Sequence, residues 1–270
     1  MIHVLTLNWN GLDKLSRLKA GLIKNLNQTD QKWAWYIRDN GSTDGSVEWL
    51  DAINGKTPEG NKIEVMKMGH NRDNFAEGVN SLFEAAKPSQ KDFILLLNND
   101  VEFGDSQSLL KMIKIMDDPN VGIVGARLLY PGTNMLQHAG VIFSNRYGKM
   151  PYHYRHKEES DSFSKKNRYF QAVTAACCLI RAEAFQKLDT KFHWSFEDID
   201  LNLRIGKDGW KIVYCGETEI YHEESASLKK NPVNRMFLSH NVTYFKKKWF
   251  GKYEIDHDKY LKDPAYNKVK

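Results

Sequence analysis

The sequence predicts an α/β protein with a mostly parallel sheet flanked by helices. Short apolar stretches alternate with segments whose apolar residues recur at helical spacing, and a βαβαβαβ series of this kind folds into a parallel sheet with helices on both faces. The apolar run 93–97 is followed at once by Asn98, Asn99 and Asp100, as expected of a strand buried on both faces. Because ligands bind beyond the carboxyl ends of such strands, we expect the functional site at this edge of the sheet.

Each element is predicted from a local pattern. The first strand enters a turn at 8–11, and leucines then recur at helical spacing. The second strand is rich in β-forming residues and runs into a polar, glycine-containing loop that starts at Asp39. The Asp39 carboxylate can accept hydrogen bonds from a base or ribose, while Ser42 or Asp44 can cap the next helix. We predict strands at 3–7, 33–37, 63–68, 93–97 and 121–128, and helices at 12–25, 47–53, 75–86 and 109–116.

Composition limits the class of protein. The chain has 270 residues, of which 41% are hydrophobic and 27% are charged, so it can bury the core of one large domain or of one and a half. Neither G-x-G-x-x-G nor G-x-x-x-x-G-K-[ST] follows a predicted strand, which argues against a dehydrogenase or a P-loop enzyme. The formal charge of +5 suits an anionic ligand or a membrane surface, and a nucleic-acid partner is not expected.

The sequence also predicts a location. No apolar run approaches the roughly 18 residues of a membrane span, and the chain opens on a strand pattern rather than on a secretion signal. Cys177 and Cys178 are adjacent and Cys215 stands alone, so there is neither an even disulfide framework nor the spacing of a metal site. We therefore expect a cytoplasmic protein with buried thiols.

The second half of the chain changes character. Residues 131–169 are polar and rich in His, Tyr and Lys, and we expect an acceptor-binding or lid segment there, with a solvated loop as the alternative. An apolar strand is predicted at 170–180, where small residues allow close approach of a ligand or another backbone. Two late strands are predicted at 210–215 and 218–222.

A cluster of acids opens the helix predicted between these strands. Ser195 is a suitable N-cap and the helix should stop at Gly209. Complementarity with the helix dipole can explain acids in a first turn, but it does not explain the aromatic residues around them. Aromatic side chains beside a carboxylate suit sugar stacking and transfer to a hydroxyl. The acids are Glu197, Asp198 and Asp200, and the aromatic residues are Phe192, Trp194 and Phe196.

Four motifs, taken together and in this order, resemble family 2 glycosyltransferases of the GT-A fold, especially the rhamnosyltransferase-like branch. The resemblance covers about residues 2–225. It implies the GT-A fold and an inverting transfer of a sugar from a nucleotide-diphosphate donor to an acceptor hydroxyl. The motifs are Leu7-Asn8-Trp9-Asn10-Gly11, the loop from Asp39 to Ser46, Asn98-Asn99-Asp100, and Phe196-Glu197-Asp198-Ile199-Asp200.

On the donor side, the resemblance implies that Asp39 contacts the nucleotide base and that Asp100 holds Mn or Mg on the diphosphate. Asn98 stands where many members carry a first Asp, so Asp100 needs other ligands. Similar enzymes place a metal-binding His where His222 stands, and an imidazole would complete the ligand set. The expected nucleotide-binding residues are Leu7, Trp9, Asp39, Asn71, Arg72, Asn98 and Asn99.

On the acceptor side, the resemblance implies that Asp198 is the general base. Trp194, Glu197 and Asp200 are expected to support the acceptor, and Asp200 could instead bond Arg204. The implied partners are a UDP-, dTDP- or GDP-sugar and a glycan or lipid-linked acceptor, in the synthesis of a surface polysaccharide or glycolipid.

We expect a glycosyltransferase domain at 1–227, with a nucleotide-sugar half at 1–103 and an acceptor half at 104–227. Residues 228–270 form a basic, aromatic, helical extension, which either contacts the inner face of the membrane or packs on the domain, with a loosely held end after 250. Two alternatives stay open. One is a binding protein for sugars or polyanions with a decayed site. The other is a sugar nucleotidyltransferase, which normally has a glycine-rich phosphate loop after the first strand.

Overall fold

The structure, a computed structural model, describes residues 1–193, 195–223 and 233–262. The strands are β1 (Ile2–Asn8), β2 (Trp33–Asp39), β3 (Gly55–Lys56), β4 (Lys62–Lys67), β5 (Phe93–Leu97), β6 (Val101–Phe103), β7 (Val121–Leu129), β8 (Leu136–His138), β9 (Val141–Phe143), β10 (Pro151–His153), β11 (Arg168–Phe170), β12 (Cys177–Arg181) and β13 (Lys211–His222). The helices are α1 (Leu12–Leu26), α2 (Ser46–Ile53), α3 (Phe75–Ala86), α4 (Ser108–Ile115), α5 (Glu197–Lys207), α6 (Val233–Trp249) and α7 (His257–Lys262), and a 3-10 turn, η1, spans Asn145–Tyr147.

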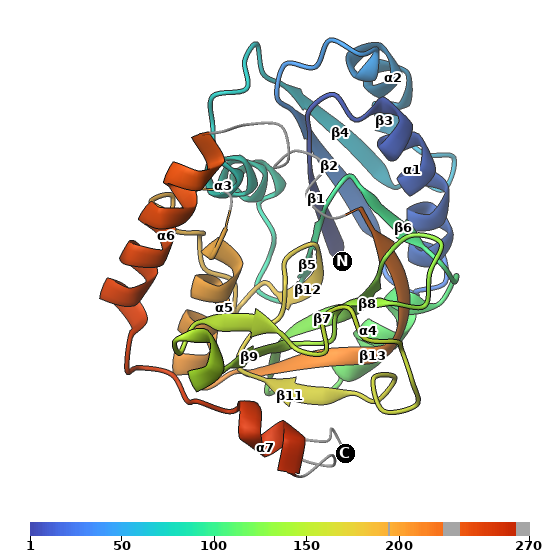
Figure 1. Ribbon diagram of the computed structural model, residues 1–270. Coiled ribbons are helices and arrows are strands. Elements are labelled where there is room, and N and C mark those ends of the chain that lie inside the picture. The colour runs from blue at the N-terminus through green and yellow to red at the C-terminus, as the bar shows by residue number, and fades with distance from the viewer. Residues whose placement is uncertain (194, 224–232, 263–270) are drawn as a thin grey trace.

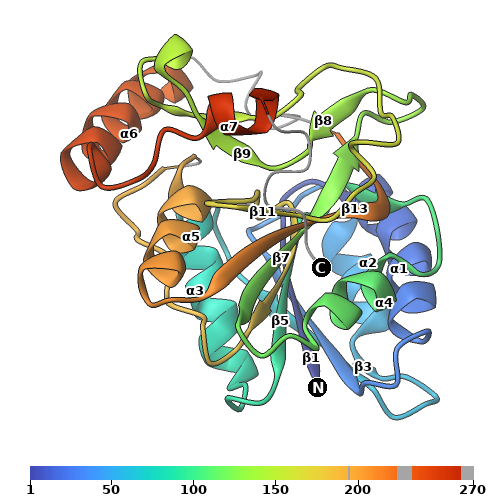
Figure 2. The same ribbon diagram turned by 90° about the horizontal axis from the view of Figure 1, so that it is seen from below.

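One mixed sheet runs through the molecule in the order β11-β13-β7-β12-β5-β1-β2-β4-β3. The pairs β5–β1, β1–β2, β2–β4 and β7–β13 are parallel, whereas β12 runs antiparallel between β5 and β7. Two separate apolar cores cover the two faces of this sheet, one with α1, α2 and α4 and the other with α3 and α5. Figure 2 shows the two layers of helices with the sheet between them. The predicted fold class is confirmed.

The direction of winding reverses between β1 and β5. From β1 the chain adds β2 and then β4 on one side, and β5 returns to the other side of β1. Asn8 pairs with Asp39 in the parallel register, so these two residues end neighbouring strands at the same edge. Ligands of open α/β sheets bind in the crevice at such a reversal, beyond the carboxyl ends of the strands.

The strands and helices predicted up to residue 129 are confirmed, with ends that differ by a few residues. The predicted helix 75–86 and strand 93–97 match their observed bounds. Asn74 begins α3 with a capping box, in which its side chain accepts from Glu77 N and the Glu77 side chain accepts from Asn74 N.

The prediction of a long polar loop at 131–169 was wrong. This segment contains β8, β9, η1 and β10, and every residue from Leu136 to Ser144 is buried. Strands of three residues are too short to show a recognisable alternation of apolar and polar side chains, so the pattern did not reveal them.

Three further boundaries differ from the prediction. The segment 170–180 is not one strand, because β11 ends at Phe170 and β12 begins at Cys177. The two late strands are one strand, β13, whose pairing with β7 shifts register between Cys215 and Ile220. A bulge of this kind places turn-forming residues inside a continuous strand, which resembles a strand break in sequence.

The helical C-terminal extension packs on the rest of the chain. Figure 1 shows α6 alongside α5, and Phe245 and Trp249 are buried in a third apolar cluster with β9 and α5. The prediction of a loosely held end after 250 was wrong for residues 251–260. Asp256 is buried, and Tyr260 stacks on Phe170 with ring centroids 4.5 Å apart.

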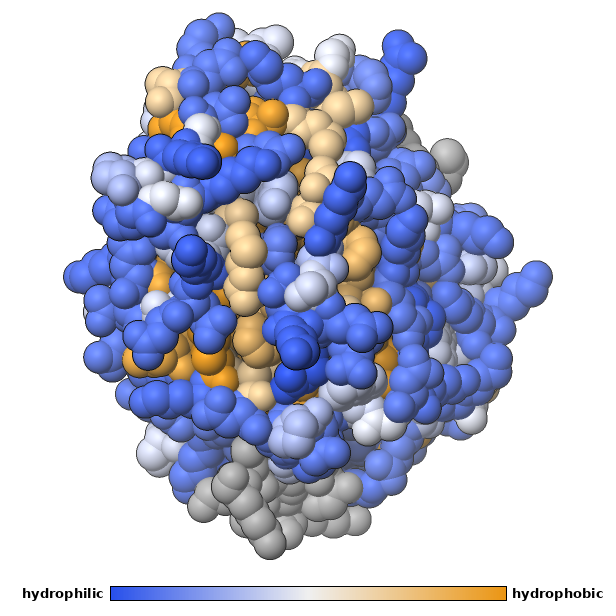
Figure 3. All heavy atoms as spheres, turned by 180° about the vertical axis from the view of Figure 1, so that it is seen from behind, coloured by the Kyte–Doolittle hydropathy of each residue, from blue (hydrophilic) through white to orange (hydrophobic). Residues whose placement is uncertain are grey.

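Hydrophilic atoms cover most of the face seen from behind, and the apolar atoms on it form interrupted patches (Figure 3). Among the described residues, no helix is both long and apolar enough to cross a membrane.

Two phenylalanines near the end of α6 test how firmly the extension is held. Phe245 is fully buried and Phe250 is 51% exposed. Phe245→Ala should lower the free energy of unfolding by about 3–5 kcal/mol through lost burial and a residual cavity, whereas Phe250→Ala should change it by less than about 0.5 kcal/mol. Urea denaturation followed by circular dichroism measures both. Equal and small losses would show that α6 is not part of the folded core.

Candidate functional site

The carboxamide of Asn8 connects the ends of three neighbouring strands. Its Nδ2 donates to Asp39 Oδ2 over 2.8 Å, and its Oδ1 accepts from Asn99 Nδ2 over 2.8 Å. Gly11 lies directly against this pair, since a Cβ at Gly11 would come within 2.4 Å of Asn99 Nδ2 and 2.5 Å of Asn8 Oδ1. A glycine is therefore required there by close approach. The network fixes the ends of β1, β2 and β5 relative to one another.

Asp39 lies inside this network. It is fully buried, its Oδ1 accepts from Ser42 N, and its Oδ2 accepts from Asn8 Nδ2 and from Ser42 Oγ. Both carboxylate oxygens of Asp39 accept hydrogen bonds from within the protein, and the bonds from Ser42 hold the loop after β2 in its conformation.

The other expected nucleotide-binding residues line the same edge. Leu7 is half-buried, Trp9 is 47% exposed, and Asn71 and Arg72 are exposed in the loop before α3. That loop is tied to β2, because buried Arg38 forms an ion pair with Asp73 and donates to Asn40 Oδ1 and Ser81 Oγ.

Strand pairing brings the two expected metal ligands together. β6 pairs with the end of β13, so His222 lies opposite Val101, the residue after Asp100. His222 Nε2 is 3.1 Å from Asp100 Oδ1, and both side chains are nearly buried. Lys14 on α1 extends toward this pair, with its Nζ 4.0 Å from Asp100 Oδ2 and 3.7 Å from Glu223 Oε2.

The donor atoms of this pair fit a divalent cation. Asp100 Oδ1 is buried and receives no hydrogen bond from the described residues, and His222 Nε2 faces it. A carboxylate with an imidazole suits Mn²⁺ or Mg²⁺, and such ions commonly take the rest of their ligands from substrate phosphates and water. Within residues 1–193, 195–223 and 233–262, no group of three or more His, Cys, Asp or Glu could hold a metal. Asp100 and His222 therefore have no third His, Cys, Asp or Glu grouped with them in the described part of the chain.

Asp198 lies in the first turn of α5. Its Oδ1 accepts from Ile199 N over 2.8 Å and its Oδ2 accepts from Ala175 N over 3.2 Å. Burial raises the pKa of Asp198, while these backbone hydrogen bonds oppose the rise. The result is an oriented carboxylate that is more basic than an exposed one.

Glu197, next to it, is buried. Its burial, together with the neighbouring Asp198 charge, raises the pKa of Glu197 to about 8, and its Oε2 has no hydrogen-bond partner among the described residues. Burial and the neighbouring acid therefore favour the neutral form of Glu197, whereas Asp198 also receives backbone hydrogen bonds that favour its charged form.

The helix that carries these acids begins unusually. The predicted N-cap, Ser195, was wrong, because Phe196 is the N-cap and has the left-handed backbone angle φ 72°. The Ser195 side chain instead accepts from Asn241 Nδ2 of α6 over 2.8 Å. A bulky residue with positive φ is costly, and such strain often occurs at functional sites. Trp194, the expected stacking residue, lies outside the described residues.

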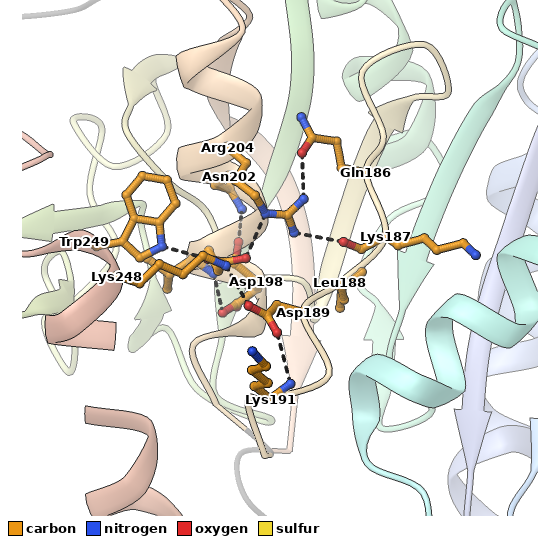
Figure 4. A network of polar contacts seen from close by, with 12 residues as sticks. Gln186, Lys187, Leu188, Asp189, Lys191, Asp198, Asn202, Arg204, Lys248 and Trp249 are labelled. Atoms are coloured by element: carbon orange, nitrogen blue, oxygen red, sulfur yellow. Dashed lines mark hydrogen bonds and ion pairs between the residues drawn. The ribbon is translucent and has the colours of Figure 1, made fainter. Parts of the chain in front are cut away.

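Asp200 braces α5 against α6. It is fully buried, accepts from Arg204 Nε and from Trp249 Nε1, and lies 2.6 Å from Lys248 Nζ. Figure 4 shows Lys248 and Trp249 of α6 beside Asp198, Asn202 and Arg204 of α5, with the Asn202 side chain donating to the backbone oxygen of Asp198. Asp200 thus takes the bond to Arg204 that the sequence left as an option.

A short segment between β11 and β12 joins the two groups of residues. Ala175 N donates to Asp198 Oδ2, and Ala176 O accepts from Asn98 N over 2.9 Å. Asp198 and the end of β5 therefore contact adjacent residues of one segment. The small side chains that the sequence showed here are what permits this approach.

Sequence reasoning missed two residues of this site. Asn8 was treated only as part of a turn, and Gln137 lies in the segment predicted as a loop. Gln137 is buried on β8, with its Oε1 2.6 Å from His222 Nδ1. A polar residue at the end of a predicted strand was a usable signal for Asn8. Nothing in the local pattern around Gln137 indicated its role.

Comparison with known proteins gives a consistent picture. The model of glycosyl transferase family 2 matches residues 8–189. The uncharacterized protein y4gI of Sinorhizobium fredii is 31% identical over 268 residues, which cover 94% of this chain and 28% of that protein. The chain thus spans less than a third of that relative. The N-acetylglucosaminyl-diphospho-decaprenol L-rhamnosyltransferase of Mycobacterium tuberculosis is 23% identical over 240 residues, which cover 80% of this chain and 75% of that enzyme.

Among solved structures, the crystal structure of GalNAc-T7 with UDP, GalNAc and Mn²⁺ has a TM-score of 0.67 to this chain. The identity is 13%, and the match covers 93% of this chain and 48% of that one. At this identity the likeness concerns the fold, which is the GT-A fold.

The raised pKa of Glu197 predicts a pH-dependent stability. In the unfolded chain Glu197 loses its proton near the ordinary glutamate pKa of 4.5, and in the folded chain it does so near 8. Between these values the folded state binds more protons, so its stability falls as pH rises from 4.5 and levels off above 8. Glu197→Gln removes this loss, and its free energy of unfolding relative to the wild type should rise by on the order of 3 kcal/mol from pH 5 to pH 8.

Urea denaturation at a series of pH values measures this difference, with exposed Glu183→Gln as the matched control. A difference between Glu197→Gln and the wild type that does not change with pH would contradict a buried, neutral Glu197.

Proposed function

The chain belongs to glycosyl transferase family 2, and we propose that it is an inverting glycosyltransferase that moves a sugar from a nucleotide-diphosphate donor to an acceptor hydroxyl. In this proposal Asp198 is the general base, and Asp100 and His222 hold a divalent metal. The observation that carries it is the segment Ala175–Ala176, which contacts both Asp198 and the strand end that leads to Asp100.

The reaction assigns a task to each group. The acceptor oxygen forms a bond to the anomeric carbon as the bond from that carbon to the diphosphate oxygen breaks. Asp198 takes the proton of the attacking hydroxyl, and its raised pKa makes it a better base for that step. A bound divalent cation would neutralise the charge that develops on the leaving diphosphate. Direct displacement from the opposite face inverts the configuration at the anomeric carbon.

The donor and acceptor follow from chemistry and from the relatives. The exposed edge at Trp9, Asn71 and Arg72 suits a nucleotide, and GalNAc-T7 was solved with UDP and Mn²⁺. We therefore propose a UDP-, dTDP- or GDP-sugar donor with Mn²⁺ or Mg²⁺. The mycobacterial relative is named for a lipid-linked acceptor, which supports a glycan or lipid-linked acceptor in surface polysaccharide or glycolipid synthesis.

We further propose that the protein works at the inner face of the cytoplasmic membrane. Phe250, at the end of α6, has the Lys149 Nζ 5.5 Å from its ring centroid, and exposed Lys246 and Lys247 lie one turn before it. Tyr147 and Tyr152, near Lys149 in the chain, are stacked and more than a third exposed. We call these six residues the aromatic–lysine patch. Aromatic rings with surrounding ammonium groups suit the interface of an anionic membrane.

Asp198→Asn tests the base. A panel of UDP, GDP, dTDP and CDP with and without Mn²⁺ first identifies the nucleotide, because a ligand of the folded state raises the melting temperature. With the matching sugar donor, Asp198→Asn should keep this metal-dependent shift and lower kcat by about 10²–10⁴-fold. Asp208→Asn, beyond the other end of α5, is the matched control. Near-normal turnover of Asp198→Asn would remove Asp198 as the base, and no shift with any nucleotide would favour a binding protein.

Vesicle sedimentation tests the membrane contact. The wild type should bind phosphatidylglycerol vesicles and should bind phosphatidylcholine vesicles weakly. Lys246→Glu with Lys247→Glu should weaken binding by about tenfold or more, since each basic residue near an anionic surface contributes about 1 kcal/mol. Lys32→Glu with Lys56→Glu makes the same change of charge on exposed residues beside β2 and in β3. Equal losses in the two double variants would indicate a response to net charge and not to the patch.

A further inference from the structure

Gln137 holds His222 through both ends of its amide. Its Oε1 lies 2.6 Å from His222 Nδ1, and its Nε2 donates to the backbone oxygen of His222 over 3.0 Å. Gln137 is 4% exposed and comes from β8, which pairs with β7 and not with the strand that carries His222. One side chain therefore fixes the backbone and the ring of the same residue.

These contacts determine which nitrogen of His222 carries the proton. An amide oxygen can only accept, so a 2.6 Å contact to Nδ1 requires that Nδ1 donates. In the neutral ring Nε2 is then left with its lone pair. Asn98 gives the same result independently, because its amide nitrogen lies 3.2 Å from His222 Nε2 and can only donate. With its lone pair on Nε2, His222 places an acceptor 3.1 Å from Asp100 Oδ1, which is also an acceptor and has no hydrogen-bond partner in the described part of the chain. Two acceptors this close repel each other, and a cation bound to both would relieve the repulsion.

Gln137 is itself held in place. Its backbone oxygen lies 3.0 Å from His156 Nδ1, and its neighbour His138 has its Nδ1 2.8 Å from His153 Nδ1. Gln137 therefore reaches His222 from a strand that is anchored on its far side. A support of this kind keeps the plane of the His222 ring from turning away from Asp100.

We propose that Gln137 is a positioning residue for the divalent cation, which acts by fixing the tautomer and orientation of the His222 ring. The inference rests on the proposed function, because it takes Asp100 and His222 as the metal ligands. Metal-binding histidines generally donate their second N–H to a protein acceptor, and loss of that acceptor commonly weakens metal binding 10–100-fold. With only two protein ligands in the described residues, the orientation of each one has a large share in the affinity.

Two substitutions separate this role from simple packing. Gln137→Met keeps the length of the side chain but has no strong acceptor, so it should weaken Mn²⁺ binding by about 10–100-fold. Gln137→Glu keeps an oxygen that accepts from Nδ1 but loses the donor to the His222 backbone oxygen, so it should bind Mn²⁺ more tightly than Gln137→Met and no more tightly than the wild type. Gln31→Met, next to the opposite, amino-terminal end of β2, is the matched control and should change nothing. Electron paramagnetic resonance of free Mn²⁺, in the presence of the nucleoside diphosphate that binds, measures all of these affinities.

A second measurement does not depend on metal or on turnover. Nitrogen-15 NMR of the metal-free wild type should show His222 with its proton on Nδ1, and Gln137→Met should shift this ring toward the Nε2–H form. A wild-type His222 that carries its proton on Nε2 would overturn the inference even if Gln137→Met does not fold. A residue with only a packing role would change the melting temperature in both Met and Glu variants without restoring metal affinity in the Glu variant.

His222→Ala distinguishes failure of the inference from failure of the proposed function. If His222→Ala weakens Mn²⁺ binding and Gln137→Met does not, the role of Gln137 is wrong and the metal site stands. If His222→Ala leaves Mn²⁺ binding unchanged, the assignment of His222 as a ligand is wrong, and the inference falls with it.

Discussion

The arrangement of the sheet edge where β1, β2 and β5 end depends on one carboxamide, that of Asn8. An amide offers a donor and an acceptor on the same planar group, and Asn8 uses the donor on Asp39 and the acceptor on Asn99. An Asp at this position would set a second carboxylate against that of buried Asp39, and a Ser could not reach both partners. Because β1, β2 and β5 end here, the loops after all three strands take their starting positions from this bridge. At the end of β5, Asn99 bonds to Asn8, while Asp100 lies against His222 and Lys14.

The position of α5, which carries the proposed base, depends on a buried carboxylate in the same manner. Asp200 would be strongly destabilising if it were unpaired, and it is neutralised by Arg204 from its own helix and by Lys248 from α6. Lys248 compensates the charge of buried Asp200 only when α6 is packed against α5. The packing of α6 therefore affects the position of α5 and of Asp198. Through this contact α6 affects the position of Asp198, the proposed base, although it lies far along the chain.

Local patterns in the sequence were sufficient for most elements before residue 129 and insufficient for much of the rest. Elements such as α3 and β5 follow from spacing and capping within a dozen residues, so their bounds were predictable. Asp100 and Asp198 could be named because they stand in short motifs at the ends of elements. The residues that hold neighbouring side chains in place could not be named, since Gln137 meets His222 across 85 residues and Asn8 meets Asn99 across 91. The three-residue strands β8, β9 and β10 are likewise stable only through pairing and burial that no local window contains.

The proposed cation site, with Asp100 and His222 as its ligands, would couple cation binding to donor binding. A cation held by Asp100 and His222 alone keeps most of its coordination positions for oxygens that are not the protein's, and a diphosphate is the group with the charge to supply them. Cation and donor would then bind with positive coupling, each completing the site for the other. Asn98, in place of a second carboxylate, would strengthen this coupling, because it lowers the negative charge that would hold a cation in the absence of the sugar donor. It also explains why the geometry of His222 is fixed from behind by Gln137. If Asp100 and His222 hold the cation, no third His, Cys, Asp or Glu in the described part of the chain is grouped with them to compensate for a ring that turns.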